Sequence, residues 1–326
     1  MIFNFHSIKP IRANFEITNL CNLRCLHCYF YRLRNVQSEG LSFSEIIKMI
    51  KKLSREGIFE FSIGGGEPLC YPRIKEILLF STQRMYTLLT TNGTLLNEEL
   101  INFFKKLPNF SLQISLDGTE KHHRKIRNMK KLQYSHLMTM IRKCVSQKIN
   151  LKIGFMLSRL NLNSLDYICR FCIKEKINSL HILPYIGEDK KFQLKFSDFL
   201  KSAKIIKKYI SKLKITIRDP FLQFLVFKKL SYCEAEFTFN IDYQGNVSPC
   251  CYMEKKEIGN IFNLRIKDIP KICEEKFKIN NRLFCPVQTA TKNVKFLRVK
   301  ELFILKSKKF FDILKISSFK NKTKEV

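Results

Sequence analysis

Three cysteines stand close together near the start of the chain, at Cys21, Cys25 and Cys28. Three thiolates on one short loop can hold three corners of a [4Fe-4S] cube, and the fourth iron then has no protein ligand. Such an iron is open to a reacting molecule. A zinc knuckle or a ferredoxin-like electron carrier is the alternative. A structural zinc site needs a fourth ligand nearby, and His27 lies between two of the cysteines, where its ring is poorly placed to reach the same metal.

The elements that position this loop follow from the hydrophobic pattern. Apolar runs alternate with amphipathic stretches between residues 12 and 183, which favours βα repeats and a parallel sheet. One helix has a clear start, because Ser42 and Glu45 form a capping-box signature. Its expected apolar stripe is Ile46, Ile47, Ile50 and Leu53. The predicted strands are 13–18, 58–63, 86–90, 110–115, 150–157 and 179–183, and the predicted helices are 42–55, 72–82, 97–106, 131–147 and 162–176.

Three further motifs follow predicted strands, and parallel barrels carry their chemistry on the loops at the carboxyl ends of the strands. The second strand leads into Gly64-Gly65-Gly66-Glu67-Pro68, where glycines let the backbone approach a ligand and Glu67 fixes the exit of the loop. The third leads into Asn92-Gly93, and the fourth into Ser115-Leu116-Asp117-Gly118, followed by His123 and Arg127. A tight turn, an Asn-Gly turn and a hydrogen-bonded helix start are the purely structural alternatives.

These motifs together resemble the radical S-adenosylmethionine (SAM) superfamily. The resemblance implies an α/β fold, an open (β/α)6 partial TIM barrel over residues 12–215. It implies that the first three cysteines hold the SAM cluster, that the glycine loop and Asn92 lie at the SAM, that Ser115 approaches the SAM ribose or carboxylate, and that Asp117 lies near the substrate as a candidate catalytic residue. Two positions depart from the family pattern, because Arg124 replaces an acidic residue and Asn128 replaces a glycine.

The chain after the barrel resembles a SPASM or twitch region, expected at 216–288. Cys233 precedes a hairpin pattern, 237–242 and 247–251, and Cys250 and Cys285 complete the proposed auxiliary ligand set. Five cysteines remain after the barrel, which limits this region to one auxiliary cluster. The fourth ligand stays open between Cys251, Cys273, an oxygen of Gln288 and a substrate atom. The alternative is that these cysteines are ordinary buried thiols, as Cys70, Cys144, Cys169 and Cys172 are expected to be.

Composition sets wider limits. A chain of 326 residues is long enough for one barrel with a small appended domain. The lead-in at 1–11 fits neither an export signal nor a membrane helix, and twelve cysteines suit a reduced cytoplasm. The formal net charge of +31 could attract polyanions, yet most of the excess is lysine in an Ile-, Asn- and Phe-rich chain. No RNA-binding motif is present, so the charge gives little support for a nucleic-acid partner.

The tail at 289–326 is different. Lysines alternate there with apolar residues, as in a basic amphipathic helix on an anionic membrane. A helix packed across the barrel is the alternative, which the pattern fits nearly as well, and the membrane surface is slightly favoured. The expected location is therefore the cytoplasm, with peripheral contact at the inner face of the membrane.

The resemblance implies reductive cleavage of SAM to a 5'-deoxyadenosyl radical, which abstracts a substrate hydrogen. It also implies an electron donor of the flavodoxin or ferredoxin type. A peptide or protein is the expected substrate. The alternatives are oxidation or epimerisation of a sugar or small metabolite, and a non-catalytic iron-sulfur electron-transfer or binding protein.

Overall fold

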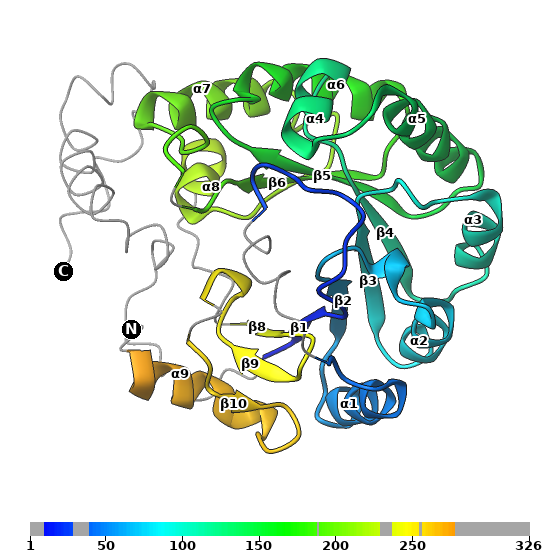
Figure 1. The fold of residues 1–326 in the computed structure, drawn as a ribbon. Coiled ribbons are helices and arrows are strands. Elements are labelled where there is room, and N and C mark those ends of the chain that lie inside the picture. Colours follow the sequence, from blue (N-terminus) through cyan, green and yellow to red (C-terminus); the bar gives the residue numbers. More distant parts are fainter. Residues whose placement is uncertain (1–9, 29–38, 188, 229–236, 254–255, 278–326) are drawn as a thin grey trace, which may run out of the picture.

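The structure is a computed structural model that describes residues 10–28, 39–187, 189–228, 237–253 and 256–277. In this part of the chain one ten-stranded sheet has the order β10-β9-β8-β1-β2-β3-β4-β5-β6-β7. The sheet curves into an incomplete barrel with the helices on its outside (Figure 1). The strands are β1 Arg12–Glu16, β2 Glu60–Gly64, β3 Tyr86–Thr91, β4 Phe110–Ser115, β5 Leu151–Leu157, β6 Ser179–Pro184, β7 Ile215–Ile217, β8 Thr238–Ile241, β9 Asn246–Ser248 and β10 Gly259–Asn260.

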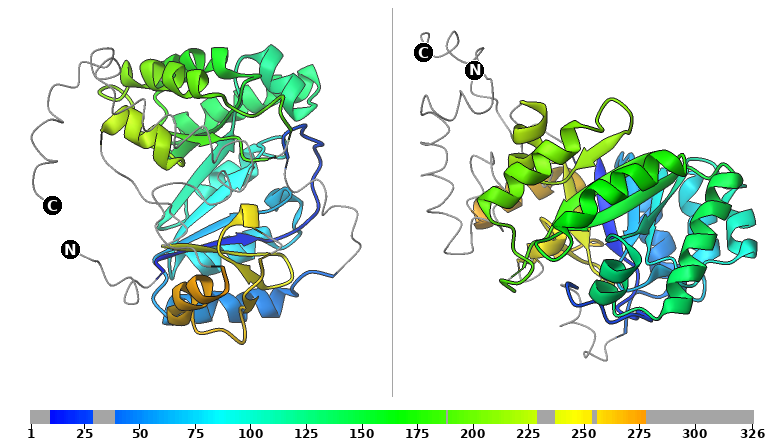
Figure 2. Two further views of the ribbon diagram at one scale, coloured as in Figure 1. Left: turned by 90° about the vertical axis from the view of Figure 1, so that its left-hand side faces the viewer. Right: turned by 90° about the horizontal axis from the view of Figure 1, so that it is seen from above.

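The helices follow the strands along the chain, and most of them lie on the convex face of the sheet, whereas α4 lies at the ends of the strands (Figures 1 and 2). They are α1 Phe43–Arg55, α2 Ile74–Thr82, α3 Glu98–Phe104, α4 Glu120–Arg127, α5 Lys131–Ser146, α6 Leu165–Lys174, α7 Phe196–Lys207, α8 Pro220–Phe227 and α9 Ile269–Phe277. Short 3-10 turns occupy Pro68–Cys70, Leu162–Ser164, Cys251–Met253 and Ile266–Asp268. The predicted α/β partial barrel is confirmed.

Local sequence signals explain where these elements begin. The predicted capping box is present at α1, where Ser42 Oγ accepts the Glu45 amide at 3.3 Å and Glu45 Oε2 accepts the Ser42 amide at 2.8 Å. Its buried stripe includes Met49, whereas Ile47 is only half-buried. The predicted stripe was wrong at that one position, because Met49 falls three residues after Ile46 and one before Ile50, on the same helix face.

Alternate residues of the central strands face opposite sides of the sheet. One set is almost completely buried: Ala13, Phe15, Phe61, Ile63, Leu89, Leu112, Ile114, Ile153, Phe155, Leu180 and Ile182. We infer that this set packs against the helices and forms the core. The other set includes half-buried polar residues at matching register positions, among them Asn14, Ser62, Thr90, Ser115 and Lys152. The inner wall of the barrel therefore presents polar groups that solvent can reach.

Two strand pairings extend the six predicted strands. β7 pairs with β6 as a further parallel strand. It runs from residue 215 to 217, so it continues past residue 215, where the barrel was predicted to end. On the other side, β8 pairs parallel with β1, so that Ala13 lies opposite Phe239 and Phe15 opposite Ile241. The hairpin of β8 and β9 follows the predicted pattern. The C-terminal region thus shares one continuous sheet with the barrel.

Several predicted features lie outside the described residues: the lead-in 1–9, Cys233, Cys285, Gln288 and the basic tail 289–326. In the ranges that are described, no helix is both long enough and apolar enough to cross a membrane.

Candidate active site

The cysteine loop follows β1, at the carboxyl ends of the parallel strands. Cys25 is buried, and Cys21 and Cys28 are half-buried. The Leu23 amide donates to Cys21 Sγ at 3.4 Å. Burial raises the pKa of the Cys25 thiol to about 11; Arg127 opposes this rise, while Cys28 and Cys21 add to it. The three thiols thus lie within electrostatic range of one another. Within the described ranges, no metal position is surrounded by three or more His, Cys, Asp or Glu side chains.

The glycine loop after β2 packs directly on the segment that leads into the cysteine loop. The Gly66 amide donates to the Thr18 carbonyl at 2.7 Å, and the Glu67 amide donates to the Leu20 carbonyl at 2.7 Å. A Cβ on Gly66 would lie 2.0 Å from the Leu20 carbonyl oxygen. A Cβ on Gly65, whose φ is +113°, would lie 2.7 Å from that of Thr18. These two glycines therefore permit close contact between two loops. From the sequence, the close approach was predicted to be to a ligand.

Glu67 joins the β2 loop to the β3 loop. Its side chain is buried, and its carboxylate accepts hydrogen bonds from Thr91 Oγ1 at 2.6 Å, the Asn92 amide at 2.7 Å and the Leu69 amide at 3.2 Å. Burial raises the pKa of this carboxyl, and the hydrogen bonds oppose the rise. Because both oxygens are used inside the protein, the carboxylate shapes the candidate cofactor site rather than facing it.

Asn92 connects the β3 loop to the cysteine loop. Its Nδ2 donates to Asn22 Oδ1 at 2.8 Å, and Asn22 Nδ2 donates to Thr94 Oγ1 at 2.7 Å. The Thr94 amide donates back to Asn92 Oδ1 at 2.9 Å, which closes a ring of polar contacts. Asn22 and Thr94 were not predicted to belong to the site. The available signal was a polar residue directly after the first cysteine.

Asp117 is completely buried, at 0% exposure, with both carboxylate oxygens engaged. Its Oδ2 accepts Arg127 Nε at 2.7 Å, and its Oδ1 accepts the Met156 amide at 2.9 Å. Although burial disfavours the charged form, Arg127 holds the pKa of this carboxyl below its usual range. With both oxygens engaged inside the protein, Asp117 holds neighbouring groups in position, and its predicted catalytic role near the substrate stays a prediction.

The predicted His123–Arg127 pair is built around this carboxylate. His123 Nδ1 accepts the Asp117 amide at 2.9 Å, and burial, with Arg127 adding to it, lowers the pKa of the ring to about 3. A neutral ring can accept this bond. Asn128 ends α4 with φ at +50°, a left-handed conformation that glycine favours and asparagine tolerates, which explains the replacement noted in the sequence. Ser115 is half-buried at the end of β4, opposite Gly154.

The C-terminal cysteines are placed in part. Cys250 and Cys251 are half-buried, and Cys273 is buried on α9. Ser248 on β9 pairs with Asn240 on β8, and Cys250 follows two residues later. Because β9 runs antiparallel to β8, the chain here heads toward the amino end of β8, away from the cysteine loop. The auxiliary ligand set stays a prediction.

Cys70 was expected only to fill space, and the structure places it beside the cysteine loop. Burial raises the pKa of its thiol, Glu67 and Cys21 add to the rise, and a hydrogen bond from the Asn22 backbone opposes it. Cys144, Cys169 and Cys172 are buried in the core as predicted.

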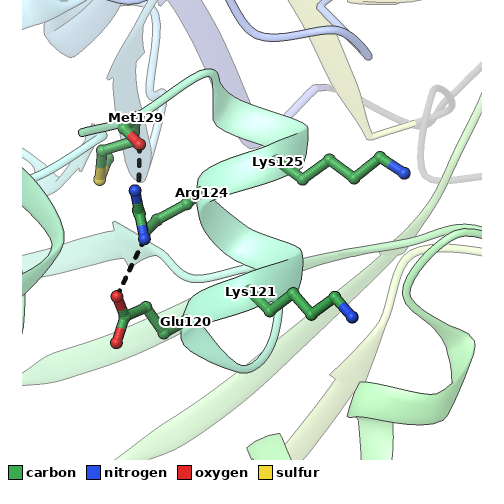
Figure 3. A pocket seen from close by; sticks show the side chains of 5 residues that line it. All are labelled: Glu120, Lys121, Arg124, Lys125 and Met129. Atoms are coloured by element: carbon green, nitrogen blue, oxygen red, sulfur yellow. Dashed lines mark hydrogen bonds and ion pairs between the residues drawn. The ribbon is translucent and has the colours of Figure 1, made fainter. Parts of the chain in front are cut away.

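An open hollow of about 510 Å³ lies on the outside of α4 (Figure 3). It is lined by Glu120, Lys121, Arg124, Lys125 and Met129. None of these is a predicted site residue. Arg124 Nη1 donates to Glu120 Oε1 at 3.1 Å and Arg124 Nε donates to the Met129 carbonyl at 3.3 Å, so the residue that departs from the family pattern has a local structural use.

The loop contact at Gly66 gives a prediction with an internal control. Gly66→Ala should lower the free energy of unfolding by about 2–4 kcal/mol, because its Cβ would overlap a backbone oxygen that cannot move away. Gly64→Ala should change it by less than about 1 kcal/mol, since nothing lies within 4 Å of a Cβ there. Urea unfolding of the two metal-free variants measures the difference. Equal midpoints would contradict the docking of the two loops.

Comparison with known proteins agrees with this geometry. The model of the radical SAM superfamily matches residues 15–166, and the SPASM model, an iron-sulfur cluster-binding domain, matches residues 233–286. The cysteine-type anaerobic sulfatase-maturating enzyme of Clostridium novyi (strain NT) is 26% identical over 312 residues, covering 79% of each chain.

Two groups of solved structures share the fold. The structure of anSMEcpe with bound AdoMet superposes with a TM-score of 0.66 at 20% identity, covering 82% of this chain and 83% of that one, and a further structure carries the Kp18Cys peptide. Streptococcus suis SuiB superposes with a TM-score of 0.67 at 17% identity. The match covers 80% of this chain and 65% of SuiB. SuiB has also been solved bound to its precursor peptide SuiA.

The chain belongs to the radical SAM superfamily. The protein is a radical SAM enzyme, and its cofactors are a [4Fe-4S] cluster and SAM. Its C-terminal region is of the SPASM type, which adds an auxiliary iron-sulfur cluster. The cysteine loop fits the first cluster in its donor chemistry, because it offers three thiols and a backbone N–H bond to one sulfur, the kind of contact that tunes such clusters.

Proposed function

We propose that this enzyme holds its SAM cluster through Cys21, Cys25 and Cys28 and modifies a peptide or protein. The observation that carries the proposal is the attachment of the cysteine loop to two neighbouring loops and to helix α4. The β2 loop bonds to residues 18 and 20, the β3 loop bonds to Asn22, and α4 bonds to the Leu26 amide through the Ile126 carbonyl at 2.8 Å. The motifs that the family uses for cluster and SAM therefore lie together at the carboxyl ends of β1 to β4.

The chain's own residues have separate tasks in this proposal. When bound, the cluster and SAM supply one electron and a primary carbon radical. The thiolates hold three irons, while Gly64 leaves open space beside the glycine loop and Ser115 offers a hydroxyl at the end of β4. Glu67, Asn92 and Asn22 fix the loops around that space through the hydrogen bonds described above. Electrons come from a donor of the flavodoxin or ferredoxin type.

The polar inner wall of the barrel suits a substrate that forms many hydrogen bonds. Both a peptide backbone and a sugar meet that description, so the wall alone does not choose between them. The relatives favour the peptide, since one is named for the maturation of sulfatases and two are solved with peptides bound. Oxidation or epimerisation of a sugar or small metabolite is the second candidate.

A fractionation experiment separates the two candidates. The anaerobically reconstituted enzyme, with SAM and reductant, would be given the peptide fraction or the small-molecule fraction of a host extract. Formation of 5'-deoxyadenosine that rises only with the peptide fraction, and falls back after protease treatment of that fraction, supports a peptide substrate. A rise that is confined to the small-molecule fraction and survives protease would favour the metabolite. A non-catalytic carrier would form no deoxyadenosine with either fraction.

We also propose that the tail 289–326 is a basic amphipathic helix on an anionic membrane surface, and that the enzyme is cytoplasmic. Vesicle affinity would come from the apolar residues Phe303, Phe310, Phe311 and Leu314, and from about 1 kcal/mol for each nearby Lys or Arg. A chain that ends at Ala290 should then lose binding to anionic vesicles, keep its melting temperature and still cleave SAM.

If the tail instead packs on the barrel, the same truncation removes buried apolar side chains worth about 1.5–3 kcal/mol each. The melting temperature would then collapse. Vesicle sedimentation and a melting curve on the same shortened chain distinguish the two cases. Undiminished sedimentation with vesicles would rule out the membrane proposal.

A further inference from the structure

A buried ion pair lies beneath the cysteine loop. The Asp117 side chain is 0% exposed and that of Arg127 is 11% exposed, with 2.7 Å between Arg127 Nε and Asp117 Oδ2. Of the ion pairs that join described residues, no other has both side chains so well covered. The Met156 amide holds the second oxygen of the carboxylate. The pair is therefore fixed between the end of β4, the end of α4 and β5.

The same helix end supports the cysteine loop. The Leu26 amide, between Cys25 and Cys28, donates to the Ile126 carbonyl at 2.8 Å, and Arg127 is the next residue of α4. Cys25 is itself buried. Arg127 follows directly after the residue whose carbonyl holds the loop between Cys25 and Cys28, and Asp117 fixes its guanidinium. A fixed positive charge is thus attached to the helix end that supports two of the three proposed cluster ligands.

We infer that Arg127 is a positioning residue that raises the reduction potential of the SAM cluster, and that Asp117 both holds Arg127 in place and partly offsets its charge. The inference rests on the proposed ligand set of Cys21, Cys25 and Cys28. Reduction adds one negative charge to the cluster, so a nearby cation stabilises the reduced form and a nearby anion destabilises it. Buried charges act more strongly than exposed ones, because solvent and salt screen them less.

The two members of the pair should therefore have opposite effects. Arg127→Met should lower the midpoint potential of the cluster, and Asp117→Asn should raise it. Arg127→Lys keeps the charge and should stay near the wild-type value. A purely structural role predicts something else, because loss of either partner would then disturb the loop in the same way.

Arg124 provides the matched control. It lies one turn earlier on α4, with 37% of its side chain exposed, and bonds to Glu120 on the same helix (Figure 3). Arg124→Met removes the same charge from the same helix, but the charge that it removes is screened by solvent. The midpoint potential of the cluster in Arg124→Met should match that of the wild type.

The measurement is a redox titration followed by electron paramagnetic resonance, without SAM or substrate, in a Cys233, Cys250, Cys285→Ala background that leaves one cluster. Opposite shifts in Arg127→Met and Asp117→Asn, with no shift in Arg124→Met, are expected. Shifts of the same sign, or no shift at equal iron content, would overturn the inference. If Asp117→Asn fails to fold, equal potentials in Arg127→Lys and Arg127→Met overturn it as well. A signal that persists after Cys21, Cys25 and Cys28 are changed to Ala would refute the proposed ligand set instead.

Discussion

Changing Cys21, Cys25 and Cys28 together to Ala is expected to reduce 5'-deoxyadenosine formation to the level of a protein-free control. The three thiolates are the proposed ligands of the cluster that leaves an iron open to SAM, and three thiolates are needed to hold such a cube. High-performance liquid chromatography of anaerobic reactions with SAM and a strong reductant measures the product. The auxiliary cluster should remain, because its proposed ligands come from a separate part of the chain.

The control for this variant is Cys144→Ala. Cys144 is a fully buried thiol on α5 that belongs to no cluster spacing, so its loss should cost a little stability and leave SAM cleavage intact. Deoxyadenosine formation that persists in the triple variant would sink the assignment of the SAM cluster.

The second large effect concerns the iron content. The reconstituted chain should hold about eight irons, as two [4Fe-4S] units, and a Cys233, Cys250, Cys285→Ala variant should hold about four. The limit is set by the five cysteines that follow the barrel, which allow one further cluster. Iron and sulfide analysis of the two proteins side by side tests this. Equal iron in both would mean that these thiols are not ligands.

A gain-of-ligand variant extends the same test. Gln288 stands where a second cysteine of a C-x2-C pair, begun by Cys285, would be. Gln288→Cys should raise the occupancy of the auxiliary cluster if position 288 contributes its fourth ligand. Unchanged occupancy would leave Cys251, Cys273 or a substrate atom as the fourth ligand.

The elements of the barrel could be predicted because their signals are local. The strand 110–115 was predicted with the bounds that the structure shows, and the capping box at Ser42 marked the start of α1 within one residue. Alternation of apolar residues and the cap are read over a few neighbouring positions. The pairing of β8 with β1 joins residues more than two hundred positions apart, and no local pattern shows it.

The candidate site divides in the same way. The cysteine spacing and the loops after the strands were visible in the sequence, because the residue types themselves carry the chemistry. The uses of Gly65, Gly66 and Glu67 were not visible, since they depend on which backbone lies against which. The burial of Asp117 and its ion pair with Arg127 could not be predicted from the sequence either, and its catalytic role stays a prediction. Asn22 and Cys70 gained a place in the site only through contacts between loops.

This chain is proposed to cleave SAM reductively at the cluster held by the cysteine loop. The most direct test incubates the anaerobically reconstituted wild-type protein with SAM and a strong reductant, and then measures 5'-deoxyadenosine and methionine together. Both products should appear in equal amounts, and neither should form without reductant. Intact SAM in a sample that iron analysis and electron paramagnetic resonance show to be loaded with a reduced cluster would contradict the proposal.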